Sequence, residues 1–177
     1  TTAERVARAV DGLGDLIDDY EFHYPQELNR DNLADVRAAL GSHGIYTVCT
    51  GLHLDPKFGR GGLISPDPAV RAEAVRLTLE AATFAAEIGA HFVVWPGIEG
   101  YNYPFQTPYA DSWKWFIDAI GQAARICKAG GVNLFLEHKN SEPAMKILMR
   151  NIGMTLHVIH KLRVEGIDNV KVNMDWQ

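Results

Sequence analysis

The chain has 177 residues, of which 47% are apolar and 22% charged, and its formal net charge is -5. Nucleic acids and anionic membranes select proteins with dense Lys and Arg, so a mildly acidic chain without a basic cluster argues against both as partners. No apolar run approaches the length of a membrane span. These properties predict a soluble globular protein whose partner is a small molecule.

The cysteine pattern and the first residues of the chain bear on its compartment. Cys49 and Cys127 are far apart and form no CxxC or Cys/His metal motif, so both are predicted to be buried free thiols. The opening stretch TTAERVARAV has a helical pattern and lacks the basic region and apolar core of a secretory signal. We therefore expect a reducing, cytoplasmic setting.

Taken in chain order, the sequence alternates helical and strand patterns. A helix over 3–16 precedes the first strand, DYEFHY at 19–24. The next elements are a helix over 30–42, a strand over 45–52, a helix over 67–88, a strand over 90–97, a helix over 109–129, a strand over 132–139, a helix over 152–164 and a strand over 169–176. Short runs rich in Val, Ile and Phe between segments of helical period predict a parallel sheet with crossover helices.

Strands that are apolar over most of their length need cover on both faces, which predicts a doubly wound α/β sheet or a (β/α)8 barrel. The residues after the first strand, HYPQEL, contain no glycine, so no glycine-rich phosphate loop is present there and the TIM barrel is favoured. Such a barrel typically needs about 250 residues. We therefore expect residues 1–177 to form a single partial TIM-barrel domain of about five parallel strands, as a fragment of a longer chain.

Polar and aromatic side chains collect where the predicted strands end, at His23, His53, Trp95, Glu137, Lys139 and Asp175. In a TIM barrel the carboxyl ends of the strands form the mouth, where catalytic groups gather. Glu137 and Lys139 are two residues apart, so strand alternation points both into the lumen. Charges there are costly without partners, and the pair predicts a polar site that holds a metal, a substrate or both.

Three stretches carry a resemblance to a known family: KFGRGGLISPDPAVRAEAV at 57–75, VVWPGIEGY at 93–101 and EHKNSEP at 137–143. The first is similar to a glycine-containing loop and helix, the second to a W-G-G-R-E-G motif and the third to an E-P-K-P-N-E-P motif. By these stretches the chain resembles the xylose (glucose) isomerase family within the xylose isomerase-like TIM barrels. The resemblance implies a divalent-metal-dependent aldose–ketose isomerase that uses Mg2+, Mn2+ or Co2+, acts on a sugar and assembles as a homo-oligomer, a dimer or a tetramer.

The resemblance also implies roles for single residues. His23 matches the histidine that hydrogen-bonds the sugar ring oxygen and assists ring opening, and Lys139 matches the lysine at the substrate's carbonyl end. Trp95 matches the tryptophan that walls the substrate site. His53 stands where the family has a substrate-facing phenylalanine, so it is expected to bind substrate in an altered way.

The metal ligands implied by the resemblance are Glu137, a carboxylate ligand of the structural metal, and Asp175, in the place of a glutamate that bridges two metals. The family's next ligand is a histidine shortly after the bridging carboxylate. By that pattern the remaining ligands are expected beyond Gln177. Oxygen ligands of this type suit hard divalent cations.

The sequence departs from the family pattern at several of these motifs. The family orients its ring-opening histidine with an aspartate three residues later, but that position is Gln26, followed by Glu27. Pro96 and Ile98 replace the first glycine and the arginine of the tryptophan motif, whereas Glu99 of this motif is expected to orient its neighbours. These departures leave open a sugar epimerase that works by metal-assisted proton transfer, or a noncatalytic sugar-binding relative.

Each candidate also has a purely structural alternative. His23 fits a hydrogen-bonded histidine at a strand end, and Trp95 fits a core aromatic. Glu137 and Lys139 fit a plain ion pair, and Asp175 fits a helix cap. An abasic-site endonuclease, which has the same superfamily fold, needs a basic surface for DNA, and the net charge of -5 argues against it.

Overall fold

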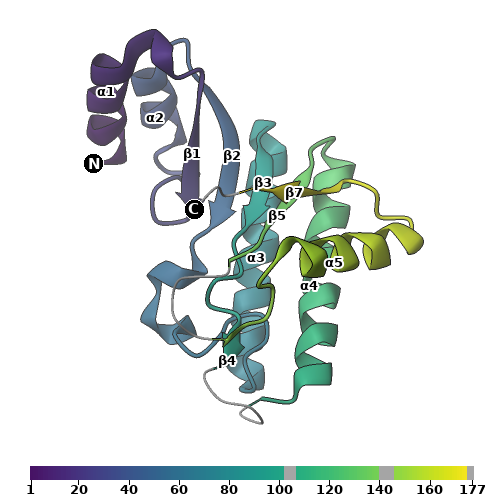
Figure 1. Cartoon of the computed structure of the whole chain (residues 1–177). Coiled ribbons are helices and arrows are strands. Elements are labelled where there is room, and N and C mark those ends of the chain that lie inside the picture. The colour runs from purple at the N-terminus through teal and green to yellow at the C-terminus, as the bar shows by residue number, and fades with distance from the viewer. Residues whose placement is uncertain (102–106, 140–145, 175–177) are drawn as a thin grey trace.

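The computed structural model describes residues 1–101, 107–139 and 146–174. A five-stranded sheet has the order β1-β2-β3-β5-β7, and every pair of neighbouring strands in it is parallel (Figure 1). The strands are β1 Asp19–Tyr24, β2 Gly44–Thr50, β3 His91–Val94, β5 Leu134–Glu137 and β7 Val170–Asn173. The predicted parallel sheet is therefore confirmed.

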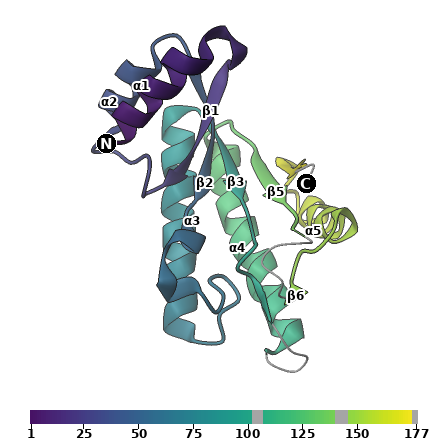
Figure 2. The same ribbon diagram turned by 60° about the vertical axis from the view of Figure 1, so that its left-hand side comes forward.

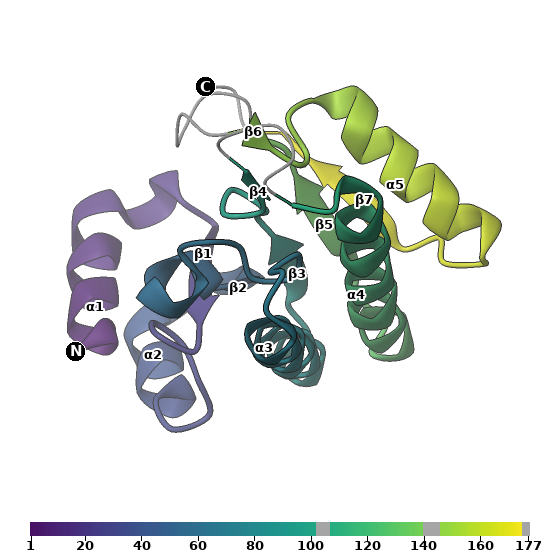
Figure 3. The same ribbon diagram turned by 90° about the horizontal axis from the view of Figure 1, so that it is seen from below.

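Helices follow one another around the outer side of this curved sheet, as Figures 2 and 3 show. They are α1 Thr2–Leu13, α2 Leu33–Leu40, α3 Pro68–Ile88, α4 Tyr109–Ala129 and α5 Ile152–Val164. Short 3-10 turns lie at η1 Gly14–Leu16, η2 Leu52–Leu54 and η3 Pro56–Phe58. In addition, β4 Gly100–Tyr101 pairs antiparallel with β6 Lys146–Ile147 in a separate two-stranded sheet.

The structure shortens most of the predicted elements at their ends. The predicted strand over 45–52 ends at Thr50, because Gly51 begins a loop whose next residues form η2. Trp95 and Lys139 follow their strands and lie in the loops beyond them. Loops and strand ends share apolar residues here, so hydrophobic pattern alone does not separate them.

The core lies between the sheet and the helices. Alternate strand residues such as Phe22, Val48, Phe92, Leu134 and Val170 are buried there. Phe84 of α3 packs against Tyr24 of β1 with ring centroids 5.1 Å apart, and small side chains on the same helix, Ala74, Ala81, Ala82 and Ala85, are also fully buried. Small residues at this contact allow the helix to approach the sheet closely.

Within the described residues, helices cover only this outer face of the sheet. The inner face instead carries polar and aromatic side chains. Tyr46, His91 and Phe135 form a layer of rings on it, with centroids 5.3 Å apart for Tyr46 and His91 and 5.4 Å apart for His91 and Phe135. The inner face has the position of a barrel lumen, and side chains from neighbouring strands project onto it.

Local sequence signals explain how the longest crossover helix before β3 begins and ends. The Asp67 side chain accepts a hydrogen bond from the Ala69 amide at 2.8 Å, and Pro68 occupies the first helical position. At the other end Gly89 adopts the left-handed conformation, with φ of 76°. These caps fix where α3 begins and where the chain turns into β3.

Both cysteines are buried and free, as predicted. In the part of the chain that the structure describes, we find no helix that combines the length and apolar character of a bilayer span.

Candidate functional site

A cavity of about 260 Å³ lies at the carboxyl ends of the strands. Its lining includes the predicted site residues His23, His53, Trp95, Glu137 and Lys139. They come from β1, from the loops after β2 and β3, and from the end of β5 and the loop that follows it. Asp175, the remaining predicted ligand, lies outside the described residues. Segments more than a hundred residues apart in the chain thus meet at one site, in the position that is catalytic in TIM barrels.

His23, the next-to-last residue of β1, is held by a carboxylate four residues later. Its ring Nδ1 lies 2.8 Å from Oε2 of Glu27, and the same oxygen accepts the backbone N–H of His23 at 2.9 Å. The turn that brings them together is closed by a hydrogen bond from the Glu27 amide to the His23 carbonyl at 2.9 Å. An ionised carboxylate only accepts hydrogen bonds, so Nδ1 carries the hydrogen and Nε2 is left as the basic ring atom.

The charge on Glu27 is favoured by this arrangement. Partial burial raises the pKa of Glu27, but the hydrogen bonds from the His23 amide and ring outweigh burial and bring the pKa below its usual value. Gln26, where the family has its orienting aspartate, instead donates from Nε2 to the Gly51 carbonyl at 3.1 Å. The orienting carboxylate is therefore present, one position later than the family pattern places it.

His53 and Trp95 form an aromatic wall beside His23. The centroids of His23 and His53 are 5.0 Å apart and those of His53 and Trp95 are 4.9 Å apart, and both pairs meet edge to face. Burial and the nearby His23 lower the pKa of His53, which favours its neutral form. His53 sits in η2, and the loop before it is fixed by the Gly51 amide, which donates to the Tyr24 carbonyl at 2.9 Å.

Glu137 and Lys139 line the same cavity, as the two-residue spacing predicts. Asn173 lies opposite Glu137 in the β5–β7 register, and its Nδ2 donates to Glu137 Oε2 at 2.6 Å. Lys139 follows the strand, and its backbone N–H donates to the Met149 carbonyl at 3.1 Å. The Glu137 carboxylate is thus oriented by the neighbouring strand, and Lys139 is tied to the returning chain before α5.

Three further residues line the cavity that the sequence prediction did not include: Glu21, Cys49 and Val93. Glu21 lies two residues before His23, so the period of two could have placed it on the same face. It accepts a hydrogen bond from the Thr47 hydroxyl of β2. Burial, together with the nearby Glu21 charge, raises the pKa of the Cys49 thiol to about 12, so Cys49 is an inert wall residue and no nucleophile.

The donor set gives a partial fit to a divalent metal. Glu137 supplies the oxygen atoms that hard cations prefer, and Asn173 orients them. Among residues 1–101, 107–139 and 146–174, however, no group of three or more His, Cys, Asp or Glu side chains is placed to hold a metal ion. The described residues therefore fit one ligand of a metal site, and a complete site needs others.

Glu99 of the second motif does not line the cavity. Only 1% of its surface is exposed, and its carboxylate accepts hydrogen bonds from the backbone amides of Gly62, Leu63 and Ile64. Burial raises the pKa of Glu99 to about 7, against the opposing effect of these amides. The expectation that Glu99 orients its neighbours agrees with this geometry.

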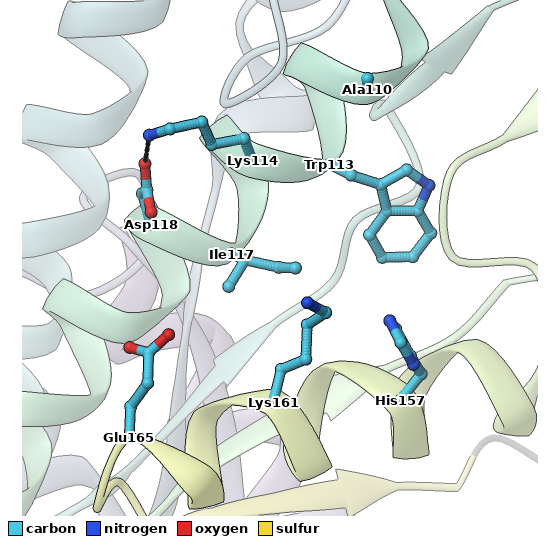
Figure 4. Close-up of a pocket in the computed structure, with 8 residues that line it drawn as sticks. All are labelled: Ala110, Trp113, Lys114, Ile117, Asp118, His157, Lys161 and Glu165. Carbon is cyan, nitrogen blue, oxygen red and sulfur yellow. Dashed lines mark hydrogen bonds and ion pairs between the residues drawn. The ribbon is translucent and has the colours of Figure 1, made fainter.

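A second cavity of about 300 Å³ lies between α4 and α5, away from the strand ends (Figure 4). Trp113 and Ile117 of α4 face His157 and Lys161 of α5 across it, and the rings of Trp113 and His157 meet edge to face at 6.3 Å. Its lining comes from the two outer helices and from Glu165, which directly follows α5. This cavity is a gap between neighbouring helices, and the convergence of polar groups favours the strand-end cavity as the functional site.

Known proteins resemble this chain in sequence or in structure. The xylose isomerase of Thermus thermophilus is 37% identical over 118 residues, which are 65% of this chain and 30% of that protein. A crystal structure of 3-keto-D-glucoside 4-epimerase, YcjR, from E. coli matches 97% of this chain and 62% of its own, with a TM-score of 0.71 and 17% identity. A structure of L-ribulose 3-epimerase matches 96% of this chain and 53% of its own, with a TM-score of 0.67 and 25% identity.

The chain thus spans about a third of the length of the xylose isomerase that it matches, and between half and two thirds of the solved epimerase chains. The family model described as "Xylose isomerase-like TIM barrel" matches residues 8–177. With the parallel strands, the crossover helices and the cavity at the strand ends, this match assigns the fold. The chain belongs to the xylose isomerase-like TIM barrel family.

Proposed function

We propose that the chain forms part of a divalent-metal-dependent sugar isomerase that interconverts an aldose and a ketose. The observation that carries this proposal is the single cavity shared by His23, His53, Trp95, Glu137 and Lys139. The 37% identity to a xylose isomerase supports the same activity. The reaction proposed is a hydride shift, in which the hydrogen on C2 moves with its electron pair to C1 while a proton passes from the C2 oxygen to the C1 oxygen.

His23 is the residue proposed to open the sugar ring. With Nδ1 bonded to Glu27, its Nε2 exchanges a proton with the sugar, and Glu27 stabilises the imidazolium that forms. Lys139 places a positive charge near the carbonyl oxygen, where negative charge develops in the transition state. Trp95 and His53 offer ring surfaces for the sugar and exclude water from one side of it.

Glu137 and Asp175 are the residues proposed to hold Mg2+, Mn2+ or Co2+, with further ligands from outside this chain's 177 residues. When bound, a divalent cation polarises the sugar carbonyl and the neighbouring hydroxyl. Asn173 keeps the Glu137 carboxylate turned toward the cavity. We also propose that residues 1–177 are one piece of a longer single-domain barrel, in which further strands pair with the edge strands β1 and β7.

The proposed surroundings of this enzyme are the cytoplasm, which the buried free thiols of Cys49 and Cys127 support. We propose a homo-oligomer, a dimer or a tetramer, on the basis of the family resemblance.

A ketose epimerase is the second candidate, and a specific residue favours it. Glu21 places a carboxylate in the cavity in addition to Glu137. If the two carboxylates flank a bound sugar, one can remove a proton from a carbon next to a carbonyl and the other can return a proton to the opposite face. Similarity in fold to two sugar epimerases supports this alternative.

One experiment on the full-length protein tests both candidates. The protein is stripped of metal with EDTA, reloaded with Mg2+, Mn2+ or Co2+, and incubated with aldoses and ketoses in D2O while products are followed by NMR. Aldose–ketose conversion without solvent deuterium at C1 supports the isomerase and its hydride shift. One deuterium per turnover at an epimerised carbon supports the epimerase instead.

Glu137→Gln and the matched surface variant Glu165→Gln complete this test. The first is expected to abolish metal-dependent turnover, and the second, on the exposed end of α5, to leave it unchanged. Turnover that survives both EDTA and Glu137→Gln would refute the metal-dependent proposal. Absence of both metal binding and turnover across the sugar panel would favour a noncatalytic sugar-binding relative.

A further inference from the structure

Glu99 lies at a junction of the loops that surround the strand-end cavity. Its Oε1 accepts the amide of Leu63 at 2.7 Å, and its Oε2 accepts those of Ile64 at 3.0 Å and Gly62 at 3.2 Å. These amides belong to the loop after β2, which begins at Gly51 and also carries His53. The Glu99 side chain thus fastens the loop after β2 to the loop after β3.

The backbone of Glu99 makes the connection to a third loop. Its carbonyl accepts the amide of Leu148 at 2.7 Å, and the next residue, Gly100, pairs with Ile147 between β4 and β6. The segment it holds returns to the cavity, because the amide of Lys139 donates to the Met149 carbonyl at 3.1 Å. The connection therefore runs from Glu99 through two adjacent residues to Lys139.

The same residue also closes its own loop. The Glu99 amide donates to the Pro96 carbonyl at 2.9 Å, in a tight turn that starts directly after Trp95. The segments joined at Glu99 therefore carry His53, Trp95 and Lys139, and each of these side chains lines the cavity.

We propose that Glu99 is a positioning residue. It holds the aromatic wall of His53 and Trp95 at a fixed position relative to Lys139. The role in catalysis rests on the proposed function of the cavity, whereas the role as a junction does not. Its carboxylate touches no substrate and acts through the loops that it holds.

The chemistry of the contact requires a carboxylate with oxygen atoms on both arms. A carboxylate offers acceptors only, and here both oxygens receive backbone N–H groups. A glutamine of the same shape would turn an NH2 group toward one of these donors and leave amides without an acceptor. Burial of a carboxylate is costly, and a position chosen only for packing would be filled by an apolar side chain.

Gly62 is the matching feature on the other side of the contact. A Cβ added there would lie 3.1 Å from Glu99 Oε1, 3.2 Å from Leu52 Cδ1 and 3.3 Å from Ala74 Cβ. Each of these distances is tight, so alanine at this position would push the loop away from the carboxylate. Gly62→Ala therefore perturbs the same junction without changing the charge of Glu99.

The test compares Glu99→Gln, Gly62→Ala and the double variant in the full-length protein, with the exposed Glu80→Gln of α3 as the matched control. Hydrogen–deuterium exchange reports on the junction, and kcat and KM for the best sugar report on positioning. We expect faster exchange over residues 61–65 and 146–149 in both single variants. We also expect kcat/KM to fall by roughly 10- to 100-fold, since a shift of about 1 Å in a positioning group costs this much.

Three results would overturn the proposal. If hydrogen–deuterium exchange in Glu99→Gln matches that of the wild type, Glu99 does not hold the loops together. Faster exchange with unchanged kcat and KM would show a structural contact without a positioning role. Losses that add in the double variant would show that Gly62 and Glu99 act independently. If the protein turns over no sugar at all, the proposed function fails, and the exchange data still decide whether Glu99 joins the loops.

Discussion

The ring of His23 and the carboxylate of Glu27 meet at 2.8 Å across a single turn at the end of β1. The contact depends on the geometry of that turn, in which the amides of Glu27 and Leu28 both donate to the His23 carbonyl, at 2.9 and 3.1 Å. A turn of this size brings a side chain four residues later back over the strand end. A histidine–carboxylate pair can therefore form here although position 26 is a glutamine.

Glu27→Gln is expected to lower kcat/KM for a cyclic sugar by roughly 100-fold, because an amide neither fixes the ring tautomer nor stabilises a charged imidazole. The loss is expected in the ring-opening step. A substrate that cannot form a ring should therefore be much less affected. Steady-state kinetics with a cyclic aldose and with a short open-chain aldose measure the difference.

The exposed variant Glu87→Gln on α3 is the control for a general effect of removing one negative charge. Equal losses for the cyclic and the open-chain substrate would contradict a ring-opening role for the His23–Glu27 pair.

Asn173→Ala is expected to weaken divalent-metal affinity by roughly 10- to 100-fold, the usual effect of removing a residue that orients a metal ligand. The cause is the loss of the 2.6 Å hydrogen bond from Asn173 Nδ2 to Glu137 Oε2, which helps to orient the carboxylate. Titration calorimetry with Mn2+ measures the affinity, and Gln122→Ala, at an exposed position of α4, is the control. Unchanged Mn2+ affinity would argue that Glu137 is not a ligand.

His53→Phe is expected to change which sugar is preferred. In the wild type the ring centroids of His53 and Trp95 are 4.9 Å apart. The substitution keeps an aromatic ring against Trp95 but removes the ring nitrogens that can hydrogen-bond a hydroxyl. Ratios of kcat/KM between sugars that differ at one hydroxyl should shift by roughly tenfold or more. If all sugars lose activity equally, His53 contributes only to packing.

The pH dependence of stability should carry a contribution from Glu99. Its pKa is about 7 in the folded protein and is expected near 4.5 when unfolded, so the folded state holds the proton longer. Protonated Glu99 therefore contributes to the free energy of unfolding. This contribution is complete below pH 4.5 and is lost as the pH rises through 7. The loss amounts to roughly 3 kcal/mol of unfolding free energy.

Thermal unfolding of wild type and Glu99→Gln between pH 4.5 and 8 tests this sign. The wild-type melting temperature should fall relative to that of the variant as the pH rises. Parallel curves for the two proteins would show that Glu99 does not titrate in this range.

Much of the fold could be read from the sequence because its signals are local. The strand at 19–24 was predicted with the bounds of β1, and the helix at 109–129 with those of α4. The period of two also placed Glu137 and Lys139 on one face, and both line the cavity. Hydrophobic pattern does not fix where a strand ends. Trp95 and Lys139 were predicted to lie in strands, but both lie in the loops that follow.

The parts of the site that escaped prediction depend on contacts between distant segments. The residues next to Glu99 in the sequence do not indicate that its carboxylate will accept the amides of Gly62, Leu63 and Ile64. The paired strands β4 and β6 have two residues each, which is too short for any periodicity. The partner of His23 was missed for a smaller reason, since a turn shifts the orienting carboxylate by one residue, to Glu27.

The ring layer of Tyr46, His91 and Phe135 lies on the inner face of the sheet, closer to the amino-terminal ends of the strands than the site residues are. In the proposed enzyme, a sugar bound in the strand-end cavity would have this ring layer on its inner side and the loops after β2, β3 and β5 around it. Those loops would then govern how substrate enters the cavity and how product leaves it. The residence time of a product would then depend on how firmly those loops are held together, even if every reacting group stayed in place.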